Sequence, residues 1–215
     1  MIFAPNSKVL FIGDSITFCE RDPARNGDDL GRGYVSLIAA RIEAHYPEAK
    51  LRFLNFGIGG NRVTDLEKRW SADVLAHRPD YVSVMIGIND VWRHFSQTIE
   101  DQVSIEAYEE KLEGLVERTL PHLKGMVLMT PYFLETNLEE PMRQQMDAYG
   151  DVVKKIAERR ECLLVDTQAA FDRWLKHGHT QRLCSDRIHP SLTGHEIIAH
   201  AFLGVIGFDS GLPKR

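Results

Sequence analysis

Cysteine is scarce in this chain of 215 residues. The three cysteines, Cys19, Cys162 and Cys184, are odd in number and none forms a Cys-x-x-Cys pair. This pattern argues against a disulfide framework and against a zinc site, and it fits a reducing compartment such as the cytoplasm. We also expect no metal and no cofactor. His177 and His179 lie close together, but no cysteine or carboxylate cluster with ligand spacing accompanies them.

The sequence also lacks the features of membrane and nucleic-acid proteins. No segment approaches about 18 consecutive apolar residues, the length that a spanning helix needs. Residues 1–8 have no basic region followed by an apolar stretch, although a signal peptide removed beforehand would leave this same sequence. The formal net charge of -5 gives no general attraction to phosphate backbones. We therefore expect a soluble, cytoplasmic protein with neither a membrane nor nucleic acid as partner.

What the sequence does contain is a regular alternation of strand and helix patterns. With 43% hydrophobic residues the chain can bury one core, and we expect a single domain over residues 1–215. Short apolar runs typical of buried strands occupy residues 9–12, 51–54, 81–86, 126–129 and 162–165. Helical spacing occurs at residues 34–46, 63–75, 105–120, 142–160 and 192–205. Such alternation predicts an α/β fold, a three-layer α/β/α sandwich with a five-stranded parallel sheet of flavodoxin type.

The first strand pattern runs directly into Asp14 and Ser15. This places a serine at the carboxyl edge of the sheet, where open α/β folds build their sites. A serine nucleophile needs a base, and the base needs a group that fixes its tautomer. Asp186 and His189, three residues apart, have the residue types for these roles. Each signal is weak alone, because Asp-Ser after a strand commonly caps a helix and Asp-x-x-His is usually an ordinary exposed pair.

Two unusual loops follow the second and third strand patterns. Residues 55–61 contain three glycines, which allow close backbone approach and let an N–H point at a developing oxyanion. A merely tight turn is the alternative, and the spacing of phosphate-binding glycine motifs is absent. Residues 87–90 contain Asn89, whose side-chain amide either donates to the same oxyanion or forms a local turn.

Four blocks resemble those of the SGNH hydrolases, the GDSL-type esterases. They are Gly13-Asp14-Ser15-Ile16, Gly60, Gly87-Ile88-Asn89-Asp90 and Asp186-Arg187-Ile188-His189-Pro190. The resemblance covers nearly the whole chain. It implies that Ser15 is the nucleophile, His189 the base and Asp186 its partner. It also implies an oxyanion hole made by the Ser15 N–H, the Gly60 N–H and the Asn89 amide. Gly59 is a neighbouring candidate, but Gly60 has the family's spacing, five residues after Asn55.

Further stretches resemble small bacterial carbohydrate acetylesterases, above all intracellular acetylxylan esterases: residues 86–93, 128–132, 147–150 and 165–171. This resemblance implies an acetylated oligosaccharide as substrate. Trp92 follows Asn89 closely enough to form one wall of the acyl-binding site, which would favour acetyl over longer acyl groups. The alternative is that Trp92 packs in the core, as tryptophans mostly do. Arg62 and Arg93 either contact sugar hydroxyls or are simply solvated.

Other functions and other residues remain open at this point. A short-chain acyl esterase, thioesterase or lysophospholipase would use the same catalytic set. A catalytically inactive carbohydrate-binding protein would have lost part of that set, which is complete here. Related acetylesterases are often homo-oligomers, some of them octamers, so the resemblance implies self-association. His195 is an alternative base, but it has no aspartate three residues before it, and we expect it to face solvent or a subunit contact.

Overall fold

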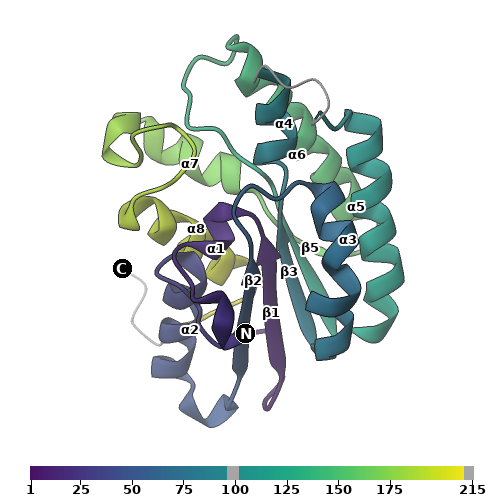
Figure 1. Cartoon of the computed structure of the whole chain (residues 1–215). Coiled ribbons are helices and arrows are strands. Elements are labelled where there is room, and N and C mark those ends of the chain that lie inside the picture. Colours follow the sequence, from purple (N-terminus) through teal and green to yellow (C-terminus); the bar gives the residue numbers. More distant parts are fainter. Residues whose placement is uncertain (96–101, 211–215) are drawn as a thin grey trace.

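A five-stranded parallel sheet forms the centre of the computed structural model, which describes residues 1–95 and 102–210 (Figure 1). Its strands are β1 (Lys8–Gly13), β2 (Arg52–Gly57), β3 (Tyr81–Met85), β4 (Gly125–Met129) and β5 (Leu163–Val165). They lie in the order β2-β1-β3-β4-β5, and every neighbouring pair is parallel. This order confirms the predicted flavodoxin type, in which ligands bind beyond the carboxyl ends of the strands that flank the switch point. Here those strands are β1 and β3.

Helices cover both faces of the sheet, which confirms the three-layer arrangement (Figure 1). One layer contains α2 (Tyr34–His45), α7 (Thr167–Leu175) and α8 (Leu192–Val205), and α8 packs on the other two. The second layer contains α3 (Val63–Asp73), α5 (Ile105–Thr119) and α6 (Pro141–Arg159), and α5 packs on the other two. The short α1 (Ser15–Phe18) follows β1, and α4 (Ile88–Phe95) follows β3. Short 3-10 helices occupy Pro23–Arg25, Pro47–Ala49, Leu75–His77, Leu120–His122 and Thr180–Arg182.

The burial pattern explains why these segments form these elements. In β1 the consecutive residues Leu10, Phe11 and Ile12 are all fully buried, as a central parallel strand covered on both faces requires. In α6 the buried residues recur with helical spacing, for example Met142, Met146 and Tyr149, so one face of the helix packs against the sheet. No helix within residues 1–95 and 102–210 combines the length and apolar composition needed to cross a bilayer.

The structure contains helices where the sequence predicted loops. Asn89 and Asp90 were expected in a loop, but they lie in the first turn of α4. Polar residues of this kind favour both turns and helix starts, and the sequence pattern does not separate the two. α7 was also missed: it begins at an Asp166 cap, whose carboxylate accepts a hydrogen bond from the Ala169 N–H. Both helices start at the carboxyl edge of the sheet, so they form part of the surface around the candidate site.

Candidate active site

The turn after β1 presents Ser15. Asp14 caps α1, and its carboxylate accepts a hydrogen bond from the Ile16 N–H at 2.9 Å. Gly13 is required at the end of the strand, because a Cβ there would lie 2.3 Å from the Met85 carbonyl oxygen. Ser15 is therefore the first residue of a helix, and its side chain is only partly buried. Capping by Asp14 and presentation of Ser15 occur together.

Ser15, His189 and Asp186 form a hydrogen-bonded chain. The Ser15 Oγ lies 2.9 Å from His189 Nε2, and His189 Nδ1 lies 2.7 Å from Asp186 Oδ2. The side chains of His189 and Asp186 are 52% and 48% exposed, so this pair is open to solvent beside the partly buried Ser15. The structure thus brings together three residues that are 174 positions apart at the extremes, in the arrangement that activates a serine hydroxyl.

Asp186 is held in its ionised form. Partial burial raises the pKa of this carboxyl, but hydrogen bonds outweigh burial and hold the pKa well below its usual range. The donors are the His189 ring, the backbone N–H groups of His189 and Ile188, and the Cys184 thiol. A carboxylate fixed in this way orients the imidazole and stabilises its protonated form during the reaction.

The four candidate N–H donors for an oxyanion belong to Ser15, Gly60, Gly59 and the Asn89 side chain. The Ser15 N–H lies in the first turn of α1, where a helix has no internal acceptor. Gly60 is exposed with φ 78°, and a Cβ built on it would have open space around it. Gly59 is also close, since a Cβ there would lie 3.9 Å from the Ser15 Cβ. The Asn89 amide donates one hydrogen to the Asn61 carbonyl oxygen at 3.0 Å, which leaves its second hydrogen for a ligand.

Two buried carboxyls lie beneath the site. Burial raises the pKa of Asp14 to about 7, although the Ile16 N–H acts in the opposite direction. Burial likewise raises the pKa of Asp90 to about 7, against the hydrogen bond from the Val63 N–H at 3.0 Å. Both groups are therefore partly protonated near neutral pH. A protonated carboxyl leaves less fixed negative charge in the protein interior.

Two further residues, not found from the sequence, hold the loops around Ser15. Arg69 on α3 donates to the carbonyl oxygens of Gly13 and Phe56 and to the Asn61 side chain, at 2.7–3.0 Å. It therefore joins the ends of β1 and β2 to the glycine loop. Asn55 on β2 is fully buried and donates to the Thr17 carbonyl oxygen at 2.7 Å. Arg69 stands next to no motif, and Asn55 begins the glycine loop without a contact that the sequence reveals, so only the folded arrangement identifies these roles.

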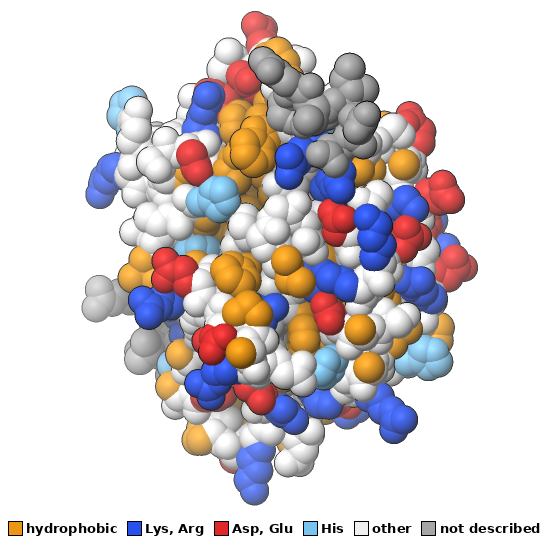
Figure 2. All heavy atoms as spheres, viewed as in Figure 1, with side chains coloured by type: hydrophobic (Ala, Val, Ile, Leu, Met, Phe, Trp, Pro, Cys, Tyr) orange, Lys and Arg blue, Asp and Glu red, His pale blue; other side chains and the backbone are white. Residues whose placement is uncertain are grey.

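The candidate substrate-binding residues differ in their surroundings. Trp92 is 43% exposed on α4, so it is not a core residue. The Arg93 guanidinium lies 6.0 Å from the centre of a Trp92 ring, and Arg62 pairs with Asp65 at 3.1 Å. Phe95 on the same helix is 47% exposed. Figure 2 shows that hydrophobic side chains gather in the upper part of the face drawn there.

The expectation for His195 is wrong. It is only 4% exposed and does not face solvent. Its Nδ1 accepts a hydrogen bond from the Tyr34 N–H, and its Nε2 lies 3.2 Å from the Cys19 sulfur. The residue packs against Gly33 at the start of α2. His195 lies on the buried side of α8, where its ring contacts Tyr34 and Cys19. Within the described residues, no group of three or more histidines, cysteines or carboxylates is placed to hold a metal ion.

Comparison with known proteins gives consistent matches. A model of the GDSL-like lipase/acylhydrolase family matches residues 11–197. The acetylxylan esterase of Geobacillus stearothermophilus is 50% identical over 214 residues, covering 97% of this chain and 98% of that protein.

Solved structures agree with the sequence matches. LAE5, an alpha/beta hydrolase enzyme from the metagenome of Lake Arreo in Spain, superposes with a TM-score of 0.95 at 51% identity, covering 97% of this chain and 98% of LAE5. Axe2, an acetylxylan esterase from Geobacillus stearothermophilus, superposes with a TM-score of 0.96 at 48% identity, covering 100% of both chains. Catalytic mutants of Axe2, in which a serine, an aspartate or a histidine is replaced by alanine, have similar structures.

Proposed function

The chain belongs to the GDSL-like lipase/acylhydrolase family, and we propose that it is a serine carbohydrate acetylesterase that removes O-acetyl groups from xylo-oligosaccharides or related acetylated sugars. The observation that carries this proposal is the hydrogen-bonded chain from Ser15 through His189 to Asp186. The 50% identity to an acetylxylan esterase over nearly the full length supports the substrate class. Fold alone would not, because one fold serves many substrates.

The reaction follows from the geometry in two steps. In the first, Ser15 Oγ attacks the acetyl carbonyl while His189 Nε2 takes the hydroxyl proton, and the sugar oxygen leaves with that proton. The negative oxygen of the tetrahedral intermediate is stabilised by the Ser15 N–H, the Gly60 N–H and the Asn89 amide. In the second step His189 takes a proton from water, which attacks the carbonyl of the acetyl-enzyme. The bond to Ser15 Oγ then breaks, Oγ receives the proton back from His189, and acetate is released. No cofactor is needed for either step.

Substrate selection rests on the rim of the site. Exposed Trp92 offers a flat face for a sugar ring and a wall for a short acyl group. We assign Arg62, which pairs with Asp65, and Arg93, which lies beside Trp92, to contacts with sugar hydroxyls. The same exposed aromatic side chains would also suit a longer acyl chain, as in a short-chain esterase, thioesterase or lysophospholipase, and the assay below separates these functions.

We further propose that one domain spans residues 1–215 and that the enzyme is a cytoplasmic homo-oligomer, with the octamer as the form to test. Cys19, Cys162 and Cys184 are all unpaired within the described residues, as suits a reducing compartment. Light scattering coupled to size-exclusion chromatography measures the oligomer directly. A monomer at micromolar concentration would refute that part of the proposal.

The decisive experiment compares the wild type with Ser15→Ala on three substrates: p-nitrophenyl acetate, p-nitrophenyl octanoate and acetylated xylo-oligosaccharides. Acetate release from the oligosaccharides, lost in Ser15→Ala, is the expected result. The exposed Ser191→Ala, at the cap of α8, serves as a matched serine control. Preference for octanoate would indicate a lipid or thioester substrate instead. Full activity of Ser15→Ala would refute the mechanism, and no activity in the wild type would favour a binding protein.

A further inference from the structure

The segment that carries Asp186 and His189 contains a residue in an unusual conformation. Arg187 has φ 66°, in the left-handed region. A residue with a side chain is stable there only when its surroundings hold it. This turn is what lets one oxygen of Asp186 accept hydrogen bonds from the N–H groups of both Ile188 and His189, at 3.0 and 2.8 Å. The conformation of Arg187 therefore sets the direction of the Asp186 carboxylate.

One neighbouring segment, residues 132–135, holds the backbone of this turn. The Leu134 N–H donates to the Arg187 carbonyl oxygen at 3.0 Å. The Tyr132 hydroxyl, which is fully buried, donates to the Ile188 carbonyl oxygen at 2.9 Å. Two consecutive carbonyl groups of the triad segment are thus fixed by the chain that follows β4.

The same segment also holds the Arg187 side chain. Its guanidinium donates to the Glu135 carboxylate at 2.7 Å and lies 5.1 Å from the centre of the Phe133 ring. The Glu135 side chain is only 19% exposed, whereas that of Arg187 is 49% exposed. An exposed ion pair adds little to overall stability. Its effect here is local, because it acts on a residue whose backbone would otherwise relax.

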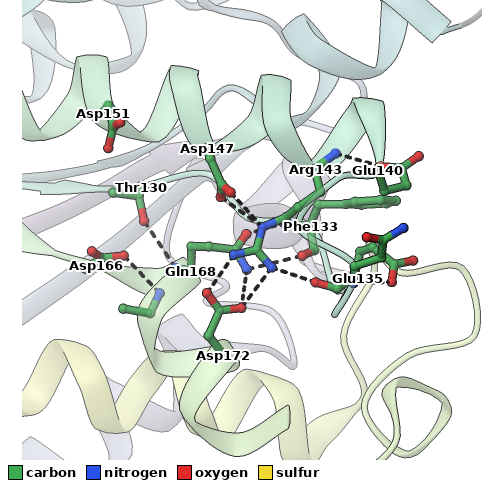
Figure 3. A network of polar contacts seen from close by, with 12 residues as sticks. Thr130, Phe133, Glu135, Glu140, Arg143, Asp147, Asp151, Asp166, Gln168 and Asp172 are labelled. Carbon is green, nitrogen blue, oxygen red and sulfur yellow. Dashed lines mark hydrogen bonds and ion pairs between the residues drawn. The ribbon is translucent and has the colours of Figure 1, made fainter. Parts of the chain in front are cut away.

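Residues 132–135 are themselves anchored by a buried polar network (Figure 3). Gln168 makes hydrogen bonds with both the N–H and the carbonyl oxygen of Phe133, at 2.7 and 3.2 Å. Arg143, which is 3% exposed, donates to the Glu135 carbonyl oxygen at 2.6 Å and binds both oxygens of Asp172. The clamp on Arg187 is therefore continuous with α6 and α7.

We propose that Arg187 is a positioning residue for the reaction: clamped between Glu135 and Phe133, its side chain keeps the turn that directs Asp186 toward His189. Arg187 contacts no reacting atom, and the inference rests on the proposed function of the triad. An arginine beside a catalytic histidine has an obvious rival role, direct contact with the substrate. The two roles differ in kinetics. Loss of a substrate contact raises KM, whereas displacement of the triad residues lowers kcat.

The test uses Arg187→Gly, Arg187→Lys and Glu135→Gln. Glycine accepts the left-handed conformation without strain but also leaves it freely, so a defect in Arg187→Gly reports loss of the side chain that holds the turn rather than a misfolded turn. Arg52→Gly is the matched control, since Arg52 also pairs with one carboxylate, Asp28 at 2.9 Å, at the opposite end of the sheet. Each variant is measured for kcat and KM on p-nitrophenyl acetate. The rate of Ser15 phosphorylation by diethyl p-nitrophenyl phosphate is measured too, because it reports activation of the serine independently of any ester substrate.

We expect kcat and the phosphorylation rate to fall about tenfold to a hundredfold in Arg187→Gly and Glu135→Gln, because small displacements of catalytic groups have effects of this size. KM stays unchanged, and Arg187→Lys recovers most of the rate. Wild-type kcat in Arg187→Gly, or a raised KM with unchanged kcat, would overturn the inference. If the wild type cleaves no acetyl ester but its phosphorylation still depends on Arg187, the proposed substrate fails and the positioning role stands.

Discussion

Asn89→Ala is the most informative single change at the proposed oxyanion hole. The Asn89 side chain is 4% exposed, and its amide makes one hydrogen bond inside the protein, to the Asn61 carbonyl oxygen at 3.0 Å. Truncation removes the second amide hydrogen, which points to no protein acceptor among the described residues. It also releases the loop that carries Gly60. The change therefore acts on two of the three proposed oxyanion donors.

The expected magnitudes separate catalysis from stability. Loss of one oxyanion donor lowers kcat by about 10²–10³, which corresponds to roughly 2.7–4 kcal/mol of transition-state stabilisation. The lost hydrogen bond to Asn61 reduces the free energy of unfolding by only about 0.5–1.5 kcal/mol. For a chain of this size, that lowers Tm by about 1–6 °C. The protein should thus remain folded at 25 °C while losing nearly all its activity.

The assay is steady-state hydrolysis of p-nitrophenyl acetate, with the concentration of reactive Ser15 determined by titration. KM should change little, because the oxyanion exists only in the transition state and the intermediate. Asn137→Ala, in an exposed loop where the Asn137 side chain accepts from the Glu139 N–H, is the control. A kcat within about threefold of wild type would refute the role of Asn89 and leave the site with backbone donors alone.

Two further predictions concern stability. Burial lowers the pKa of His195 to about 4, so the unfolded chain binds a proton at this residue between about pH 6.5 and 4 while the folded chain does not. Stability is therefore lost as pH falls through that window, by up to about 3 kcal/mol. Urea unfolding of His195→Gln at pH 4.5 and 7 should show a shallower pH dependence than the wild type, and equal slopes would contradict this. Arg143→Met should lower the free energy of unfolding by about 1.5–3 kcal/mol, because it removes the hydrogen bonds of a buried guanidinium to Asp147 and Asp172. The corresponding fall in Tm is about 3–12 °C. Thermal unfolding beside Arg52→Met tests this, and equal shifts in the two variants would argue against a special role of the network.

Predictions from the sequence succeeded where the signal is local. Each of the five strands was found because a run of apolar residues is bounded by polar residues and glycines, and their alternation with helices predicted that they are parallel. The failures have two origins, an ambiguous local signal and a contact between distant residues. Asn89 and Asp90 suit a turn and a helix start equally, so α4 was missed. His195 has no sequence neighbour that reveals its contact with Tyr34, which lies 161 positions away.

The sequence by itself determined which side chains could do the chemistry and at which edge of the sheet they would lie. Strand periodicity and the positions of Ser15, Asn89 and His189 after strand ends or in a short motif are properties of neighbouring residues. Only the tertiary structure decided how these groups are held. The clamp of Glu135 on Arg187 joins residues 52 positions apart, and the arginine network behind it joins three segments. Such contacts depend on distances that chain closure and packing set together, and no periodicity in a single sequence encodes them.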